Sequence, residues 1–140
     1  VYRADSNALG ALSIRTPGGA LGIKPAEFER LALRWVITGG ESGPGARVCD
    51  AEWIRDLHRH RMVANTPFFP KQLGALAIDD DHGIVGARLP LTKEALMYVR
   101  RLKDAHGGDE TEWAPDLQGL RSFPAPAPLS LAQRRHLGIS

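Results

Sequence analysis

The chain has 140 residues, of which 43% are hydrophobic and 24% are charged, a composition typical of one globular domain. The net charge of +2 does not by itself indicate nucleic-acid binding, and the single cysteine excludes an internal disulfide. No apolar run reaches the roughly 18 residues of a membrane span, and no secretory leader is apparent, so a cytoplasmic protein is expected.

The first 25 residues predict a poorly organised N-terminal segment. The stretch "TPGGALGIKP" (16–25) is rich in glycine and proline, which favour loops. Before it, residues 8–14 are compatible with a short strand or a buried turn. A short helix is expected over 25–34, with a proline in its first turn.

Residues 34–62 contain a strand, a glycine-rich loop and a helix. The strand is predicted at "RWVIT" (34–38), because its apolar, β-branched residues stop at a Gly-Gly pair. The unbroken apolar run indicates burial on both faces, as in a parallel sheet. Asp50 is a suitable N-cap for a helix over 51–62. The inner stripe of this helix comprises Trp53, Ile54 and Leu57, and its arginines are expected to face water.

A second strand is predicted at "FFPKQ" (68–72), where Pro70 indicates a strand end or a sheet edge. A strand, a helix and a second strand in this order normally form a right-handed crossover between neighbouring parallel strands. The predicted fold class is therefore α/β, with a partial β/α-barrel-like parallel strand–helix–strand unit and a C-terminal helical and irregular segment. This α/β partial-barrel domain is expected to span residues 26–124.

The C-terminal part begins with an acidic turn at "DDDHG" (79–83) and continues with a predicted helix over 92–108. The inner side of that helix would comprise Ala95, Leu96, Val99 and Leu102. An irregular surface segment (110–124) follows. Its anchors would be Trp113, Leu117, Leu120 and Phe123. Residues 125–140 are expected to form a flexible Pro/Ala tail.

The loop after the first strand, "GGESGPGAR" (39–47), is the strongest candidate for a binding site. Loops at the carboxyl ends of parallel strands bind ligands in α/β proteins, and glycines let backbone N–H groups approach an anion. Arg47 is suited to a two-point contact with phosphate or carboxylate, and Glu41 is suited to accept from an amine or a hydroxyl. The alternative is a tight turn in which Arg47 and Glu41 pair with each other.

The spacing of this loop excludes several named motifs. It ends in "GAR" and not in the Gly-Lys-Ser/Thr of a P-loop, and Pro44 stands where a hydrolase elbow needs glycine. Lys71 and Gln72 are expected at the same rim, because neighbouring parallel strands point the same way. The predicted ligand-binding residues are Gly39, Gly40, Glu41, Ser42, Gly43, Arg47, Lys71 and Gln72, and no catalytic residue is assigned.

Other candidate residues favour structural roles. His58 and His60 lie two positions apart on the predicted helix and point to different sides, so no metal site is expected. Cys49 alone cannot ligate an iron–sulfur cluster, and a small buried side chain is favoured. A basic surface that binds nucleic acid or a host protein is the non-enzymatic alternative. Its residues would be Arg55, Arg59, Arg61, Arg100 and Arg101.

The motifs "WVITGGESGPGAR" (35–47), "EWIRDLH" (52–58) and "TPFFPKQLG" (66–74) resemble the C-terminal part of a bacteriophage and prophage family of unknown function, named after phage gene products thirty-seven and sixty-eight. The stretch "GGDETEWAPDLQGLRSFP" (107–124) is similar to the closing part of that family. Full-length members carry an N-terminal cysteine cluster that resembles the iron–sulfur site of radical S-adenosylmethionine enzymes, on a β/α barrel or partial barrel. The resemblance implies a phage or prophage protein in a bacterial host.

The chain departs from the family pattern, because it lacks the cysteine cluster and has Pro70 and Leu73 where Phe and Trp are usual. The resemblance implies a C-terminal fragment, or a decayed or split version, of a radical-SAM-like barrel protein of unknown reaction with a small-molecule ligand. No cofactor is expected in this chain alone, whereas full-length relatives are expected to hold an iron–sulfur cluster and S-adenosylmethionine. Self-association or a missing N-terminal half is expected, because a two-strand core would expose Phe68 and Phe69.

Overall fold

The computed structural model of the protein describes residues 11–15, 26, 30, 33–125 and 129–139. Within these residues the protein is of the α/β class, with two small sheets, two helices and short 3-10 turns. One sheet is parallel and one is mixed, and neither closes into a barrel.

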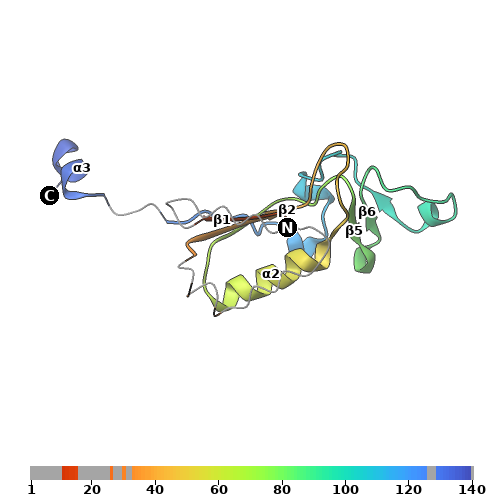
Figure 1. The fold of residues 1–140 in the computed structure, drawn as a ribbon, viewed down its shortest axis with the longest axis horizontal. Helices are drawn as coiled ribbons and strands as arrows, with labels where there is room; N and C mark the ends of the chain where they lie inside the picture. The colour runs from red at the N-terminus through yellow and green to blue at the C-terminus, as the bar shows by residue number, and fades with distance from the viewer. Residues whose placement is uncertain (1–10, 16–25, 27–29, 31–32, 126–128, 140) are drawn as a thin grey trace.

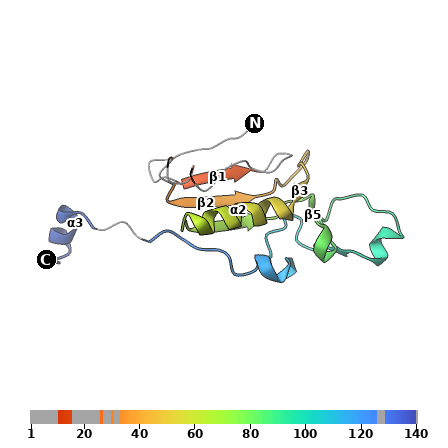
Figure 2. The ribbon, with the colours of Figure 1, turned by 90° about the horizontal axis from the view of Figure 1, so that it is seen from below.

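The first sheet contains the strands that were predicted around the glycine-rich loop. It is formed by β1 (Ala11–Arg15), β2 (Trp35–Gly39) and β4 (Phe68–Gln72), in the order β1-β2-β4 and parallel throughout. The helix α2 (Ala51–Val63) lies between β2 and β4 in the chain and runs along one face of this sheet (Figures 1 and 2). The predicted strand–helix–strand unit is therefore confirmed, and β1, which overlaps the segment 8–14, adds a third strand.

Local signals in the sequence set the start of α2. The side chain of Asp50 accepts a hydrogen bond from the backbone N–H of Glu52 at 2.9 Å, which satisfies one of the unpaired donors of the first turn. Ile54 and Leu57 are buried against the sheet, as their spacing predicts, while Trp53 is only half-buried.

Pro70 marks a sheet edge, as predicted, and the edge is covered. β4 pairs with β2 on one side only. On its other side, the backbone N–H of Ser122 donates to Phe68 O at 2.8 Å, and Arg121 donates to Pro70 O at 3.0 Å and to Lys71 O at 2.6 Å. The segment around Arg121 therefore satisfies carbonyl groups that an exposed edge strand would leave to water.

The second sheet was not predicted. It consists of β3 (Cys49–Asp50), β5 (Ala77–Asp79), β6 (Ile84–Val85) and β7 (Arg100–Arg101), in that order. β5 and β6 are antiparallel, and the 3-10 turn η1 (Asp80–His82) with Gly83 in the left-handed region connects them. The acidic turn predicted at 79–83 is confirmed.

The helix predicted over 92–108 is wrong. This stretch contains one 3-10 turn, η2 (Ala95–Met97), followed by β7. The backbone N–H of Arg100 donates to Gly83 O at 2.6 Å and that of Leu102 donates to Val85 O at 3.0 Å, so donors that a helix would use internally pair with β6. Leu102 is buried, but Leu96 is 44% exposed, so the predicted apolar stripe does not face one core.

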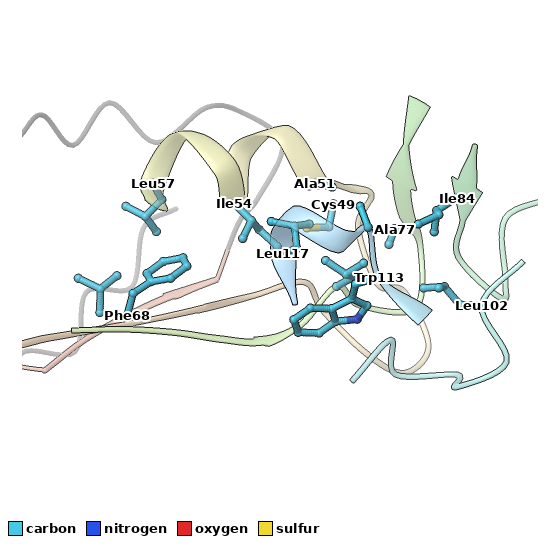
Figure 3. Packing of buried hydrophobic residues seen from close by; sticks show 13 residues of the cluster. Cys49, Ala51, Ile54, Leu57, Phe68, Ala77, Ile84, Leu102, Trp113 and Leu117 are labelled. Atoms are coloured by element: carbon cyan, nitrogen blue, oxygen red, sulfur yellow. The ribbon is translucent and has the colours of Figure 1, made fainter. Parts of the chain in front are cut away.

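The core lies between α2, the two sheets and the segment 110–124 (Figure 3). Phe68 of β4 packs beneath Ile54 and Leu57 of α2. The expectation that Phe68 is exposed is wrong, because its side chain is 0% exposed and packs against α2. Trp113 and Leu117 are 1% exposed and Leu120 packs against the core, which confirms three of the four predicted anchors of the segment 110–124. The prediction of Phe123 as an anchor is wrong, because its side chain is 69% exposed. That segment contains the 3-10 turns η3 (Glu110–Glu112) and η4 (Pro115–Leu117).

Two predictions concern the ends of the chain, a helix over 25–34 and a tail over 125–140. The helix predicted over 25–34 falls mostly outside the described residues, of which Ala26 and Arg30 have helical backbone. In the tail, where no element was predicted, the short helix α3 (Leu131–His136) begins with a capping box between Ser130 and Gln133. None of the described helices has the length and hydropathy needed to cross a bilayer.

Candidate functional site

The carboxyl ends of β2 and β4 lie side by side, as predicted. The backbone N–H of Gly40 donates to Gln72 O at 2.9 Å, and Gln72 Nε2 donates to Gly40 O at 2.9 Å. One step further, the N–H of Ala75 donates to Glu41 O at 2.8 Å. The glycine-rich loop and the Lys–Gln strand end therefore share one rim of the parallel sheet, which we call the strand-end rim (residues 39–47 and 71–75).

Glycine is required where the two strand ends touch. A Cβ on Gly40 would lie 2.0 Å from Leu73 O, and a Cβ on Gly74 would lie 2.7 Å from Glu41 O. Gly74 also has φ +96°, a backbone conformation that residues with a Cβ rarely adopt. The backbones of the two strand ends are therefore in direct contact at these glycines.

The middle of the loop is open by contrast. Gly43 and Gly45 have φ values of +89° and +73°, and a Cβ on either residue would meet no heavy atom within 4 Å. Ser42 is exposed. The loop therefore leaves the sheet in a fixed direction, but its central residues face open space.

Arg47 and Glu41 pair with each other across this loop. Glu41 Oε2 accepts from the backbone N–H of Arg47 at 3.0 Å, and Arg47 Nε donates to Oε1 at 3.1 Å and to Oε2 at 3.2 Å. The terminal nitrogen Nη2 of Arg47 also contacts Oε1. Hydrogen bonding to Glu41 raises the pKa of Arg47 above its ordinary value. The structure thus shows the paired turn that was the alternative reading of these residues.

Lys71 and Gln72 occupy the same rim with different roles. The side chain of Gln72 is used within the protein, in the bond to Gly40 O. Lys71 is exposed. Of the two residues, Lys71 is therefore the one that is exposed to solvent at this rim.

A third segment, residues 104–109, also reaches the strand-end rim, and the sequence analysis did not predict this contact. The backbone N–H of Leu73 donates to Gly107 O at 2.8 Å, and that of Gly74 donates to His106 O at 3.0 Å. The turn is organised by Asp104, whose carboxylate accepts from three backbone N–H groups, those of His106, Gly108 and Asp109. These bonds, led by that from His106, lower the pKa of Asp104. The two glycines of "GGD" (107–109) could have indicated a close approach between backbones, but these glycines were assigned to the end of the predicted helix.

Arg55 of α2 is buried, contrary to the prediction from the sequence. The helix arginines were expected to face water, but Arg55 is 9% exposed. Its guanidinium donates to both oxygens of Asp79, which is 2% exposed, and to both oxygens of Asp116. Hydrogen bonds to Asp116 and Asp79 raise the pKa of Arg55, and the bond from Arg55 lowers the pKa of Asp116. This cluster ties α2 to β5 and η4.

The other arginines of the predicted basic surface are also engaged within the protein. Arg59 pairs with Glu52 and Asp56, and Arg61 Nε donates to His58 Nδ1 at 3.0 Å. The guanidinium groups of Arg100 and Arg101 donate to backbone carbonyls. Nucleic-acid binding through this set stays a prediction, which a gel-shift assay at low salt would test.

The residues of this chain do not fit an iron–sulfur cluster. The chain has one cysteine, whereas such clusters take three or four thiolates. That residue, Cys49, is 1% exposed and belongs to the hydrophobic core, which confirms its prediction as a small buried side chain. Any cluster would have to be held by residues outside this chain.

The fold and the rim define an α/β protein with a glycine-rich loop at the carboxyl ends of parallel strands. The family model described as "Protein of unknown function (DUF5131)" matches residues 8–115, and the chain belongs to this family. The match covers both sheets, α2 and the whole strand-end rim. No curated protein and no solved structure matches the chain.

Proposed function

We propose that the strand-end rim binds a small molecule that carries an anionic group. The observation that carries this proposal is the reciprocal pair of hydrogen bonds between Gly40 and Gln72, which brings an open glycine loop and a lysine to the same end of two parallel strands. This end of an α/β sheet is where ligands are bound in many unrelated proteins.

The residues of the rim divide into a scaffold and a binding set. Gly40 and Gln72 hold the two strand ends together and do not face the ligand. The exposed backbone around Gly43, with the guanidinium of Arg47 and the ammonium of Lys71, supplies donors and positive charge for the anionic group. Glu41 supplies an acceptor for a donor of the ligand.

We further propose that the sheet is part of a larger β/α-barrel-like assembly, as the resemblance to phage proteins of the radical-SAM-like type implies. Two observations support this. The sheet order β1-β2-β4 follows the order of these strands in the chain, as in barrels wound in one direction. The face opposite α2 carries Trp35, Phe69 and Phe123, whose rings lie 5.3 to 6.1 Å apart, and Phe123 is 69% exposed. Parallel sheets are normally covered on both faces.

The binding proposal is tested by titrating the isotope-labelled 140-residue chain with S-adenosylmethionine and, separately, with inorganic phosphate. Backbone amide resonances of Gly43, Gly45 and Arg47 are expected to shift with at least one of these probes. The double variant Arg47→Ala, Lys71→Ala is expected to lose the response. Rim resonances that stay unchanged with both probes would overturn the proposal.

A matched control uses two exposed cations away from the rim. Lys93 and Arg134 are exposed, and Arg134 lies on α3. The double variant Lys93→Ala, Arg134→Ala removes the same charge as the rim variant. It is expected to keep the full response, and its failure to do so would show that net charge, and not the rim, causes binding.

A further inference from the structure

The anionic group recognised by Arg47 in this structure is the protein's own Glu41. The backbone N–H and Nε of Arg47 converge on the two carboxylate oxygens of Glu41 at 3.0 to 3.2 Å, and Nη2 contacts Oε1. The proposed function assigns the guanidinium of Arg47 to an external anion, and in this structure that guanidinium contacts Glu41. Donors of Arg47 reach both oxygens, as in the two-point contact by which arginine binds a planar carboxylate.

The contact between Arg47 and Glu41 is open to exchange for a contact between Arg47 and a ligand. The side chain of Arg47 is 51% exposed and that of Glu41 is 21% exposed. Solvent therefore reaches the guanidinium of Arg47 and screens its attraction to Glu41 more than in a fully buried pair. A ligand that offers a carboxylate can approach Arg47 from solvent and compete with Glu41 for it.

The surroundings of the pair leave room for the exchange. Gly43 and Gly45, between the two partners in the chain, face open space. The backbone of Glu41 is anchored independently, because its carbonyl accepts from the N–H of Ala75 at 2.8 Å. The side chain of Glu41 can thus turn away from Arg47 while the loop keeps its attachment to the rim.

We propose that Glu41 is an internal competitor at a carboxylate-binding site formed by the backbone N–H and guanidinium of Arg47, and that a carboxylate of the ligand displaces it. This inference rests on the proposed function and adds to it the chemical class of the anionic group and a mechanism of competition. It also assigns Glu41 two states, one paired with Arg47 and one released when the ligand is bound.

The test uses acetate as the probe and compares the wild-type chain with the variants Glu41→Ala and Glu41→Gln. Acetate is titrated while the amide and Nε–H resonances of Arg47 are followed. In Glu41→Ala, acetate is expected to move these resonances toward their wild-type positions, because it replaces the missing carboxylate. Its dissociation constant is expected to be about three- to tenfold lower for Glu41→Ala than for the wild type, since the competing group is gone.

Matched variants separate the site from general charge effects. Asp56→Ala also removes an exposed carboxylate from an arginine, Arg59, but no backbone N–H of the described residues donates to that carboxylate. It is expected to show no gain in acetate binding. The double variant Glu41→Ala, Arg47→Ala is expected to lose acetate binding entirely.

The outcomes distinguish this inference from the proposed function. If acetate binds the wild type and Glu41→Ala equally, or binds neither while S-adenosylmethionine or phosphate still shifts the rim resonances, the competition is wrong and the proposed function stands. If no probe shifts the rim, both are wrong. Glu41→Gln keeps the size of the side chain, so an equal gain in Glu41→Gln and Glu41→Ala assigns the effect to the lost charge and not to a disturbed fold.

Discussion

The guanidinium of Arg55 forms a two-point ion pair with Asp79, with Nη1 to Oδ1 at 3.1 Å and Nη2 to Oδ2 at 2.7 Å. The two residues are 24 positions apart and belong to α2 and β5, so the pair connects the helix of the first sheet to the second sheet. Asp116 of η4 binds the same guanidinium from the C-terminal segment. One side chain therefore fixes three parts of the fold.

Removal of this arginine is expected to be strongly destabilising. Arg55→Ala removes the guanidinium from the buried carboxylate of Asp79 and leaves only the contact from His82 Nδ1 at 3.3 Å. The loss of one partner costs about 3–5 kcal/mol in comparable buried pairs. Arg55→Lys is not expected to restore stability, because an ammonium cannot bind two carboxylates with a planar fork. The measurement is the free energy of unfolding in urea.

The control for this prediction lies one turn further along the same helix. Arg59 also pairs with two carboxylates, but its side chain is 56% exposed. Arg59→Ala is expected to change the free energy of unfolding by less than about 1 kcal/mol. Equal losses for the two variants would contradict the importance of burial at Arg55.

The pair between Arg55 and Asp116 predicts a dependence of stability on pH. The pKa of Asp116 is lowered in the folded protein, so its contribution is complete above the unfolded value of about 3.9 and is lost as pH falls through the folded value. The stability difference between wild type and Asp116→Asn is therefore expected to shrink below about pH 4. Unfolding in urea at pH 6 and pH 3 measures it.

The control for the pH experiment is Asp80, an exposed carboxylate on the neighbouring turn η1. Asp80→Asn is expected to leave the pH profile of the wild type unchanged. A difference between wild type and Asp116→Asn that stays constant from pH 6 to pH 3 would refute the role assigned to the Asp116 carboxylate.

The glycines of the rim are expected to differ sharply in their tolerance of alanine. In Gly40→Ala the new Cβ would lie 2.0 Å from Leu73 O, so the two strand ends must separate. We expect a loss of more than about 3 kcal/mol, or failure to fold. In Gly43→Ala the Cβ meets open space and only the positive φ is strained, so a loss of about 1 kcal/mol is expected. Thermal unfolding of both variants checks the contrast, and equal effects would argue against direct contact between the strand ends.

Arg121 is expected to stabilise the covered edge of β4. Its guanidinium donates to the carbonyls of Pro70, Lys71 and Gly108, and lies 5.3 Å from the ring centre of Phe69. Arg121→Ala is expected to cost about 2 kcal/mol, the typical size of a charged hydrogen-bond contribution.

Hydrogen exchange gives the second readout for this edge. Amide exchange at Ser122, whose N–H donates to Phe68 O, is expected to accelerate in Arg121→Ala as the segment loosens. Arg134→Ala on α3 removes a charge without touching β4 and is expected to leave exchange at Ser122 unchanged. Unaltered protection in Arg121→Ala would show that other contacts hold the edge.

Much of the first sheet could be predicted because its signals are local. The strand β2 ends at a Gly-Gly pair, Asp50 caps α2 through a neighbouring N–H, and Pro70 marks an edge by lacking a donor. The parallel crossover rule then places the two strand ends at one rim. The pairing of Glu41 with Arg47 was foreseen as one of two readings, since six positions across a turn is a short distance.

The second sheet could not be predicted, because strands of two or three residues have no periodicity of their own. β6 and β7 form through pairing across a loop, as in the bond from Arg100 N to Gly83 O, and this pairing outweighs the helix pattern of 92–108. The position of the turn held by Asp104 could not be predicted either, because it too depends on backbone bonds between distant segments, from Leu73 and Gly74 to the turn.

The sequence by itself determined the α/β class, the helix α2 with its cap, and the neighbouring ends of β2 and β4, because each depends on residues close in the chain or on a general rule of chain handedness. Only the tertiary structure decided which charges are buried and which arginines are engaged. The burial of Arg55 depends on Asp79 and Asp116, which lie 24 and 61 positions away. A charged side chain is normally buried only where partner groups of opposite charge are present. Here the tertiary fold brings these partners from distant positions in the chain, and no local sequence pattern predicts their proximity.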